Sequence, residues 1–257
     1  MLNESDIKAA VIDKLFASAA LSDAVLINEM VIANWSRRAD LVVANGKLHA
    51  FEIKSDFDSL RRLHGQIETY LTRFDKVTVV CTPKFAHLVK ESTEARVEIW
   101  CAASTADGVK LSVYRRGQTT PVSNKRILYG YLHKPELVEL LKNAGCAANT
   151  EMTRTQLEFA ADALSSRRIK EFVLEALKKR YREPFERFCD SRMSQTQPSD
   201  LVNLRKFRLQ TQAQESVTGL NDGDTDVQNA KALDLKAISK KFGPLPPEMP
   251  SFVRRRA

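Results

Sequence analysis

The chain has 257 residues, 43% of them apolar, which suffices for a conventional core in one large domain or in one domain with an appendage. No run approaches the roughly 20 apolar residues that cross a membrane, and the N-terminus lacks the basic and apolar regions of a signal peptide. We therefore expect a cytoplasmic protein without membrane contact. The formal net charge of +8 favours a polyanionic partner without establishing one.

The cysteines give no sign of a structural metal or of a disulfide framework. They are Cys81, Cys101, Cys146 and Cys189. All four lie far apart, without a Cys-x-x-Cys pair or a close histidine, so we interpret them as buried free thiols.

The first part of the chain predicts a helix followed by three strands. Apolar residues at every fourth position predict a helix over residues 3–20. A branched apolar run at residues 25–32 is typical of a strand. Two more strand-like runs, residues 38–44 and 47–54, flank the turn dipeptide Asn45-Gly46 and predict a hairpin.

A second helix and further strands follow. Apolar side chains spaced by three and four predict a helix over residues 58–74 with one buried stripe. The continuous apolar run at residues 76–82 is typical of a strand covered on both faces. Residues 97–101 and 109–114 are weaker strand candidates. The order helix, three strands, helix, strand predicts an α/β fold.

After about residue 130 the strand signals stop. Helices are predicted over residues 135–143, 153–164 and 167–188. A capping-box pattern opens the second helix, and Pro184 is expected to break or kink the third. The tail is polar and proline-rich, so we expect much of it to be disordered. The sequence thus divides into an α/β domain (1–118), a helical region (130–190) and a low-order tail (191–257).

Two acids and a lysine in the hairpin can carry chemistry. The side-chain period of two in a strand puts Glu52 and Lys54 on one face and Ile53 on the other. Asp40 and Glu52 can offer carboxylate oxygens to Mg²⁺, and Ile53 can add its backbone carbonyl. Lys54 can orient an attacking water or stabilise negative charge at phosphorus. This set suits hydrolysis of a phosphodiester, which needs a divalent cation.

The hairpin register decides whether the two acids meet. A tight two-residue turn would set Asp40 and Glu52 on opposite faces of the sheet. The site therefore requires paired residue numbers that sum to an even value, such as Val43 with Lys47. Such a register needs a three-residue loop with Gly46 left-handed.

Asp40, eleven intervening residues and then Glu52-Ile53-Lys54 resemble the signature of the PD-(D/E)XK, or restriction-endonuclease-like, nuclease superfamily. The predicted order of elements also matches the core of that superfamily. Gln66 and Tyr70 resemble the Gln-x-x-x-Tyr motif of its RecB-like branch. The resemblance covers residues 1 to about 115, and the motif block looks like small bacterial and phage proteins of this superfamily.

The resemblance implies a metal-dependent nuclease site. It implies Asp40 and Glu52 as ligands of Mg²⁺, for which Mn²⁺ can substitute, with Lys54 as catalytic base. Gln66 would help to position the substrate. Several such nucleases carry a supporting glutamate in the first helix, and Glu4 is the candidate here.

Contacts to nucleic acid are expected around this site. The candidates are Arg38, Arg62, Tyr70 and Arg73. Arginines suit phosphate backbones, and Tyr70 shares a helical face with Gln66. DNA is a more natural partner than RNA for this kind of site, and a homodimer would allow both strands to be cut.

Each of these features also has a plainer interpretation. Exposed Glu and Lys are common at strand edges, and arginines are ordinary surface residues. The helix macrodipole favours an acid such as Glu4 in a first turn without any function. Tyr70 lies beside the apolar stripe of its helix and can belong to the core.

Three functions therefore stay open. We favour a Mg²⁺-dependent endonuclease acting on DNA, because a pure binder needs no carboxylates facing a phosphate. The first alternative is a module that keeps the nuclease fold and grips nucleic acid without cleaving it. The second is a partner-binding protein in phage defence or its evasion.

Overall fold

The computed structural model describes residues 1–32, 36–106, 108–205, 230–232 and 252–254. Met1–Leu209 form one compact unit, which contains both the expected α/β domain and the expected helical region. In the second unit, Gln210–Ala257, the short strands β7 (Ala230–Ala232) and β8 (Phe252–Arg254) pair antiparallel. The expectation of a disordered tail lies mostly outside the described residues.

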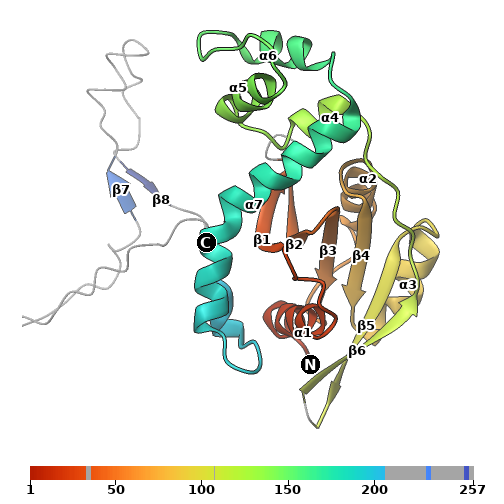
Figure 1. The fold of residues 1–257 in the computed structure, drawn as a ribbon. Helices are drawn as coiled ribbons and strands as arrows, with labels where there is room; N and C mark the ends of the chain where they lie inside the picture. Colours follow the sequence, from red (N-terminus) through yellow and green to blue (C-terminus); the bar gives the residue numbers. More distant parts are fainter. Residues whose placement is uncertain (33–35, 107, 206–229, 233–251, 255–257) are drawn as a thin grey trace, which may run out of the picture. The chain divides into compact units, whose positions relative to one another are not determined.

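The first unit is built around a six-stranded mixed sheet whose strands lie side by side in chain order (Figure 1). They are β1 (Val25–Ile32), β2 (Arg37–Ala44), β3 (Leu48–Lys54), β4 (Lys76–Cys81), β5 (Glu98–Thr105) and β6 (Gly108–Arg115). The pairs β3–β4 and β4–β5 are parallel, and the other three are antiparallel. All the strands expected from the sequence are confirmed, and β5 continues beyond its predicted end.

Helices cover both faces of this sheet. Helix α2 (Leu63–Arg73) connects β3 to β4, and α3 (Pro83–Ser92) connects β4 to β5. Because crossovers between parallel strands are right-handed, both helices pack on the same face. Helix α1 (Glu4–Ala17) covers the opposite face, where it contacts β3 and β6 (Figure 1). The α/β architecture predicted from the element order is therefore present.

The expected helical region is present, with α4 (Lys125–Tyr129), α5 (Lys134–Asn143), α6 (Arg154–Ala161) and α7 (Ser166–Ser191). The 3-10 helix η1 (Pro198–Leu204) follows in the segment expected to be a low-order tail, where it is ordered because Leu201 and Leu204 are buried. Long helix α7 packs against β1, β2 and η1 (Figure 1). It continues through Pro184, so the expected break does not occur; Phe185 and Phe188 beyond it both stack on Phe16 of α1.

Some helix boundaries differ from those predicted. Helix α2 begins at Leu63 and not at Asp58, because the Asp58 carboxylate accepts hydrogen bonds from the amide and hydroxyl of Ser55 and holds a turn there. Helices α3 and α4 are not anticipated from the sequence, although Pro83 at the first position of α3 is a typical start signal. No helix among the described residues is long and apolar enough to cross a membrane.

The buried carboxylate of Asp75 joins the sheet to the C-terminal helices. Asp75 is 2% exposed and accepts hydrogen bonds from the backbone amides of Leu48 and Val122, each at 2.7 Å. It also forms an ion pair with the ammonium of Lys170 in α7. One side chain thus ties together the start of β3, the segment after β6 and the longest helix.

Replacing Asp75 with alanine should lower the free energy of unfolding by about 3 kcal/mol, because Lys170 and two amides lose a buried acceptor. Urea denaturation followed by circular dichroism would measure this loss. Glu91→Ala is the control, since Glu91 pairs with His87 on the exposed surface of α3 and its loss should cost less than about 0.5 kcal/mol. Equal effects of the two substitutions would contradict this role of Asp75.

Candidate functional site

The β2–β3 hairpin has the register that the site requires. Ala44 pairs with Leu48 across a three-residue loop, and Gly46 in that loop is left-handed with φ of 59°. The paired numbers sum to an even value, as predicted, although Val43 pairs with His49 and not with Lys47. The next opposed positions after Leu41 and Phe51 are Asp40 and Glu52. Directly opposed residues share a face of the sheet, so these two acids do as well.

A third acid, Glu29 of β1, extends the row. The pairs on either side of it, Asn28 with Leu41 and Met30 with Ala39, leave Glu29 opposite Asp40. Glu29 has φ of 59°, a left-handed conformation that is costly for a residue with a side chain. Strained backbone of this kind persists only where surrounding contacts hold it, and Glu29 has such contacts.

Two acids of this row, Glu29 and Asp40, lie beside Glu4 of helix α1. Carboxylate oxygens of Glu4, Glu29 and Asp40 all lie within 4.8 Å of one another. The ammonium of Lys8 lies 2.7 Å from both Glu4 and Glu29. Asp40 accepts a hydrogen bond of 2.7 Å from the backbone amide of Ile53. The chain thus gathers three carboxylates and one buried ammonium at the junction of α1, β1 and β2.

Glu52 is only 1% exposed, and a separate set of hydrogen-bond donors surrounds its carboxylate. Its Oε1 accepts from Lys54 Nζ at 2.7 Å and from Gln66 Nε2 at 2.6 Å. Its Oε2 lies 2.8 Å from the hydroxyl of Tyr70, which is also 2.7 Å from the carbonyl oxygen of Arg38. A hydroxyl has one proton, so Tyr70 donates to one of these oxygens at a time.

The environment shifts the pKa values of several of these groups. Burial, reinforced by repulsion from Glu52, raises the pKa of Asp40 to about 8. Burial and the charge of Glu52 also raise the pKa of Tyr70, so its hydroxyl stays protonated. Burial by itself would lower the pKa of Lys8, but its hydrogen bonds to Glu29 and Glu4 outweigh burial and raise it. Asp40, Tyr70 and Lys8 therefore each lose their proton at a higher pH than usual.

Asp40 and Glu52 line one cavity of about 560 Å³. The residues expected from the sequence that line it are Glu4, Arg38, Asp40, Glu52, Ile53, Lys54, Arg62 and Gln66. Arg37 adds a third arginine to the lining. Acids inside and arginines at the edge together suit a phosphate held beside a cation.

Two of the expected nucleic-acid contacts are not at the surface of this cavity. Tyr70 is 0% exposed, so it supports Glu52 from inside the core and cannot touch a nucleic acid. Arg73 ends α2, whereas Arg62 precedes its first turn, and a helix of this length separates them by about 16 Å. Arg73 instead hydrogen-bonds the hydroxyl of Thr72.

Glu29 and Lys8 are site residues that the sequence reasoning missed. Glu29 is the one charged residue in the apolar run of β1, and that isolation could have drawn attention to it. Lys8 gives no comparable signal, because a lysine inside an amphipathic helix is ordinary.

The donor set fits a hard divalent cation. The three clustered side chains offer only carboxylate oxygens, which Mg²⁺ and Mn²⁺ prefer as ligands. The ammonium of Lys8 balances two of these carboxylates, so a cation bound among them would have to displace it. Gln66 and Lys54 lie beside the cluster, within reach of a bound phosphate in the same cavity.

Comparison with known proteins gives a family. The family model described as Bacteriophage P4 protein cII matches residues 1–205. "Protein cII" of Enterobacteria phage P4 is 37% identical over 259 residues, covering 100% of this chain and 98% of that protein. A solved structure, the SPO1766 protein of unknown function from Silicibacter pomeroyi, is 16% identical, with 58% of this chain and 98% of that chain covered. Its TM-score of 0.38 is too low to carry any argument. The chain belongs to the bacteriophage P4 protein cII family.

Proposed function

We propose that this protein is a metal-dependent nuclease of the PD-(D/E)XK kind that hydrolyses phosphodiester bonds of DNA. The observation that carries the proposal is the lining of one cavity by Asp40, Glu52 and Lys54, with Gln66 hydrogen-bonded between the last two. A surface of solvated charges would not bury Glu52 and Lys54 while keeping them beside further carboxylates.

In this proposal, Asp40, Glu29 and Glu4 hold Mg²⁺ or Mn²⁺, with Glu52 beside them. When bound, the ion activates water and stabilises the leaving oxygen. Lys54, freed from Glu52, orients the attacking water or stabilises negative charge at phosphorus. Gln66, which contacts both Glu52 and Lys54, would help to position the substrate.

Basic residues at the edge of the cavity would hold the nucleic acid. The side chain of Arg38 is 63% exposed and pairs with Glu29 at 2.7 Å, so it links the rim to the acid cluster. Arg62 is exposed at the start of α2. These contacts would grip the phosphate backbone without reading sequence. A homodimer would present two such sites, one for each strand of a duplex.

One observation favours a second candidate, a module that binds nucleic acid without cleaving it. One carboxylate oxygen of Glu52 already accepts from Lys54 and Gln66, and the other lies 2.8 Å from the hydroxyl of Tyr70. A network satisfied in this way is stable without an ion. Cleavage and ion binding therefore separate the two candidates, because only the enzyme requires the network to open.

Asp40→Asn and Glu52→Gln keep the shape of each side chain while removing its charge. Each should lower the rate of DNA cleavage by about 10³-fold, and Lys54→Met by about 10²-fold. Plasmid cleavage in Mg²⁺ and in Mn²⁺ would measure these rates. Lys178→Met is the matched control, since Lys178 is a buried lysine paired with Asp23, away from the cavity; it should cleave normally.

Nucleic-acid affinity should survive all of these substitutions and fall steeply with added salt, because it would come from arginine contacts to phosphates. If the folded wild-type protein cleaves neither DNA nor RNA and binds neither ion by calorimetry, the enzyme is excluded. Retained, salt-sensitive binding would then leave the binding module as the function.

Ion binding should depend on pH, because a proton on Asp40 competes with the ion. With the pKa of Asp40 at about 8, most molecules carry this proton at pH 6 to 7 and must release it. The affinity for Mg²⁺ should rise on the order of tenfold per pH unit between pH 6 and 8 and then level off. Calorimetry in buffers of different ionisation enthalpy should count close to one proton released at pH 7. In Asp40→Asn the weakened affinity should lose this slope, and an unchanged slope would contradict the assignment.

A further inference from the structure

A second cavity lies on the other face of the sheet. It has a volume of about 340 Å³, within the range of about 300–1,000 Å³ common for small-molecule sites. Its lining includes His49 and Trp100, whereas Glu52 lines the first cavity. Since side chains of β3 alternate between faces, His49 and Glu52 point to opposite sides. The two cavities are therefore distinct.

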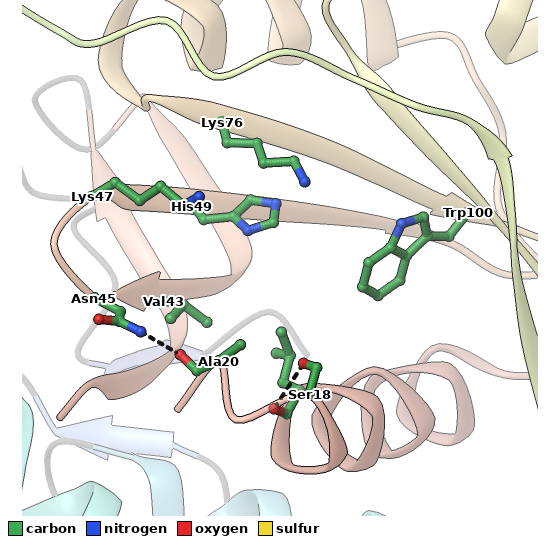
Figure 2. A pocket seen from close by; sticks show the side chains of 9 residues that line it. Ser18, Ala20, Val43, Asn45, Lys47, His49, Lys76 and Trp100 are labelled. Carbon is green, nitrogen blue, oxygen red and sulfur yellow. Dashed lines mark hydrogen bonds between the residues drawn. The ribbon is translucent and has the colours of Figure 1, made fainter. Parts of the chain in front are cut away.

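The rim of this cavity is fixed by hydrogen bonds within the chain. The side chain of Asn45 donates to the carbonyl oxygen of Ala20 at 2.8 Å. The hydroxyl of Ser18 donates to the carbonyl oxygen of Leu15 at 3.1 Å. Figure 2 shows both bonds along the lower edge of the cavity, below His49 and Trp100. A site tied in place loses little conformational entropy when it binds a ligand.

Trp100 offers a hydrogen-bond donor that nothing in the described chain accepts. The residue is 8% exposed, and its indole Nε1 is buried without a partner. Figure 2 shows the nitrogen edge of the indole turned toward His49, into the cavity. The ring itself is held by Phe51, whose centroid lies 5.6 Å away. A buried donor left unpaired destabilises the protein, and a ligand acceptor would remove that cost.

His49 faces this donor as a neutral ring. Burial, together with the charges of Lys76 and Lys47, lowers the pKa of His49 well below its usual value. The hydroxyl of Thr78 donates to Glu98 at 2.9 Å, so its oxygen accepts from His49 Nε2 at 2.7 Å. This chain fixes the proton on Nε2 and leaves Nδ1 as an acceptor.

Lysines give the cavity a positive charge. Lys47 is exposed and has no acidic partner among the described residues, while Lys76 pairs with Glu98 at 2.8 Å. Figure 2 shows both extending along the sheet toward His49. The ammonium of Lys14 lies 5.3 Å from the centre of the Trp100 ring. Two lysines thus line the cavity, and a third lies over the ring of Trp100.

We propose that this cavity binds a small organic anion, an aromatic ring that carries one carboxylate or phosphate group. The ring would pack on Trp100, Leu15 and Val43, which form the apolar wall. The anionic group would accept from Trp100 Nε1 and face the ammonium groups of Lys47 and Lys76. This inference is independent of the nuclease proposal, since it concerns the other face of the sheet.

Four probes test both halves of the proposed ligand. Benzoate and phenyl phosphate carry ring and charge, benzyl alcohol carries the ring alone, and inorganic phosphate carries the charge alone. The chain has two tryptophans, so Trp35→Phe leaves Trp100 as the only one and its fluorescence as a direct reporter. Benzoate or phenyl phosphate should quench this fluorescence with a dissociation constant in roughly the micromolar to millimolar range. Each should bind at least about tenfold more tightly than benzyl alcohol or inorganic phosphate.

Two substitutions locate the site. Trp100→Phe removes the indole donor and keeps an aromatic ring, and should weaken binding in calorimetry by about tenfold. Lys47→Glu reverses a charge at the rim and should weaken it by about fivefold or more. Lys110→Glu makes the same charge change on an exposed residue of β6, outside the cavity, and should have no effect.

The proposal is overturned if neither benzoate nor phenyl phosphate binds at about 10 mM. It is also overturned if Trp100→Phe and Lys47→Glu, with melting temperatures close to that of the wild type, bind both probes as tightly as the Lys110→Glu control. Preference for phenyl phosphate over benzoate, or the reverse, would identify which anionic group the cavity selects.

Discussion

The register of the β2–β3 hairpin decides which side chains share a face of the sheet, and the candidate site depends on it. A slip of one residue would move Asp40 away from Glu52, because side chains alternate along each strand. The three-residue loop with left-handed Gly46 fixes the register at the closed end. At the open end, the amide of Ile53 donates to the carboxylate of Asp40, so a site residue also holds the strands together.

The site concentrates charge where burial makes charge costly, and it is stable only as a set. Removing two opposite charges from water costs several kcal/mol for each, which close hydrogen-bonded pairing must offset. Glu52 has three donors for this purpose, and Lys8 has two carboxylates. Loss of one member would leave its partners buried and unpaired. The left-handed backbone at Glu29 adds strain of the kind found at functional sites.

Strand β3 serves both faces of the sheet. Its even-numbered side chains Glu52 and Lys54 reach the first cavity, while His49 reaches the cavity beside Trp100. The two cavities differ in chemistry, because carboxylates and basic side chains together line the first, whereas lysines and an aromatic wall line the second. Such a division needs a strand that is covered on both sides, and every residue of β3 is buried. Asp75 anchors the start of this strand to α7.

The sequence by itself determined the strands, the hairpin and the capping of α6, because these follow from periodicities and turn residues over short stretches. Only the tertiary structure decided the rest. Strand pairing brings Glu29 beside Asp40, and packing of α1 brings Lys8 there. The isolated charge of Glu29 marks the residue but not its neighbours, and Lys8 leaves no local pattern. Tyr70 lies in the core, where its hydroxyl contacts Glu52 and the carbonyl oxygen of Arg38. Helix α7 also continues through Pro184, where local preference alone predicts a break, because residues beyond the proline pack against distant parts of the chain.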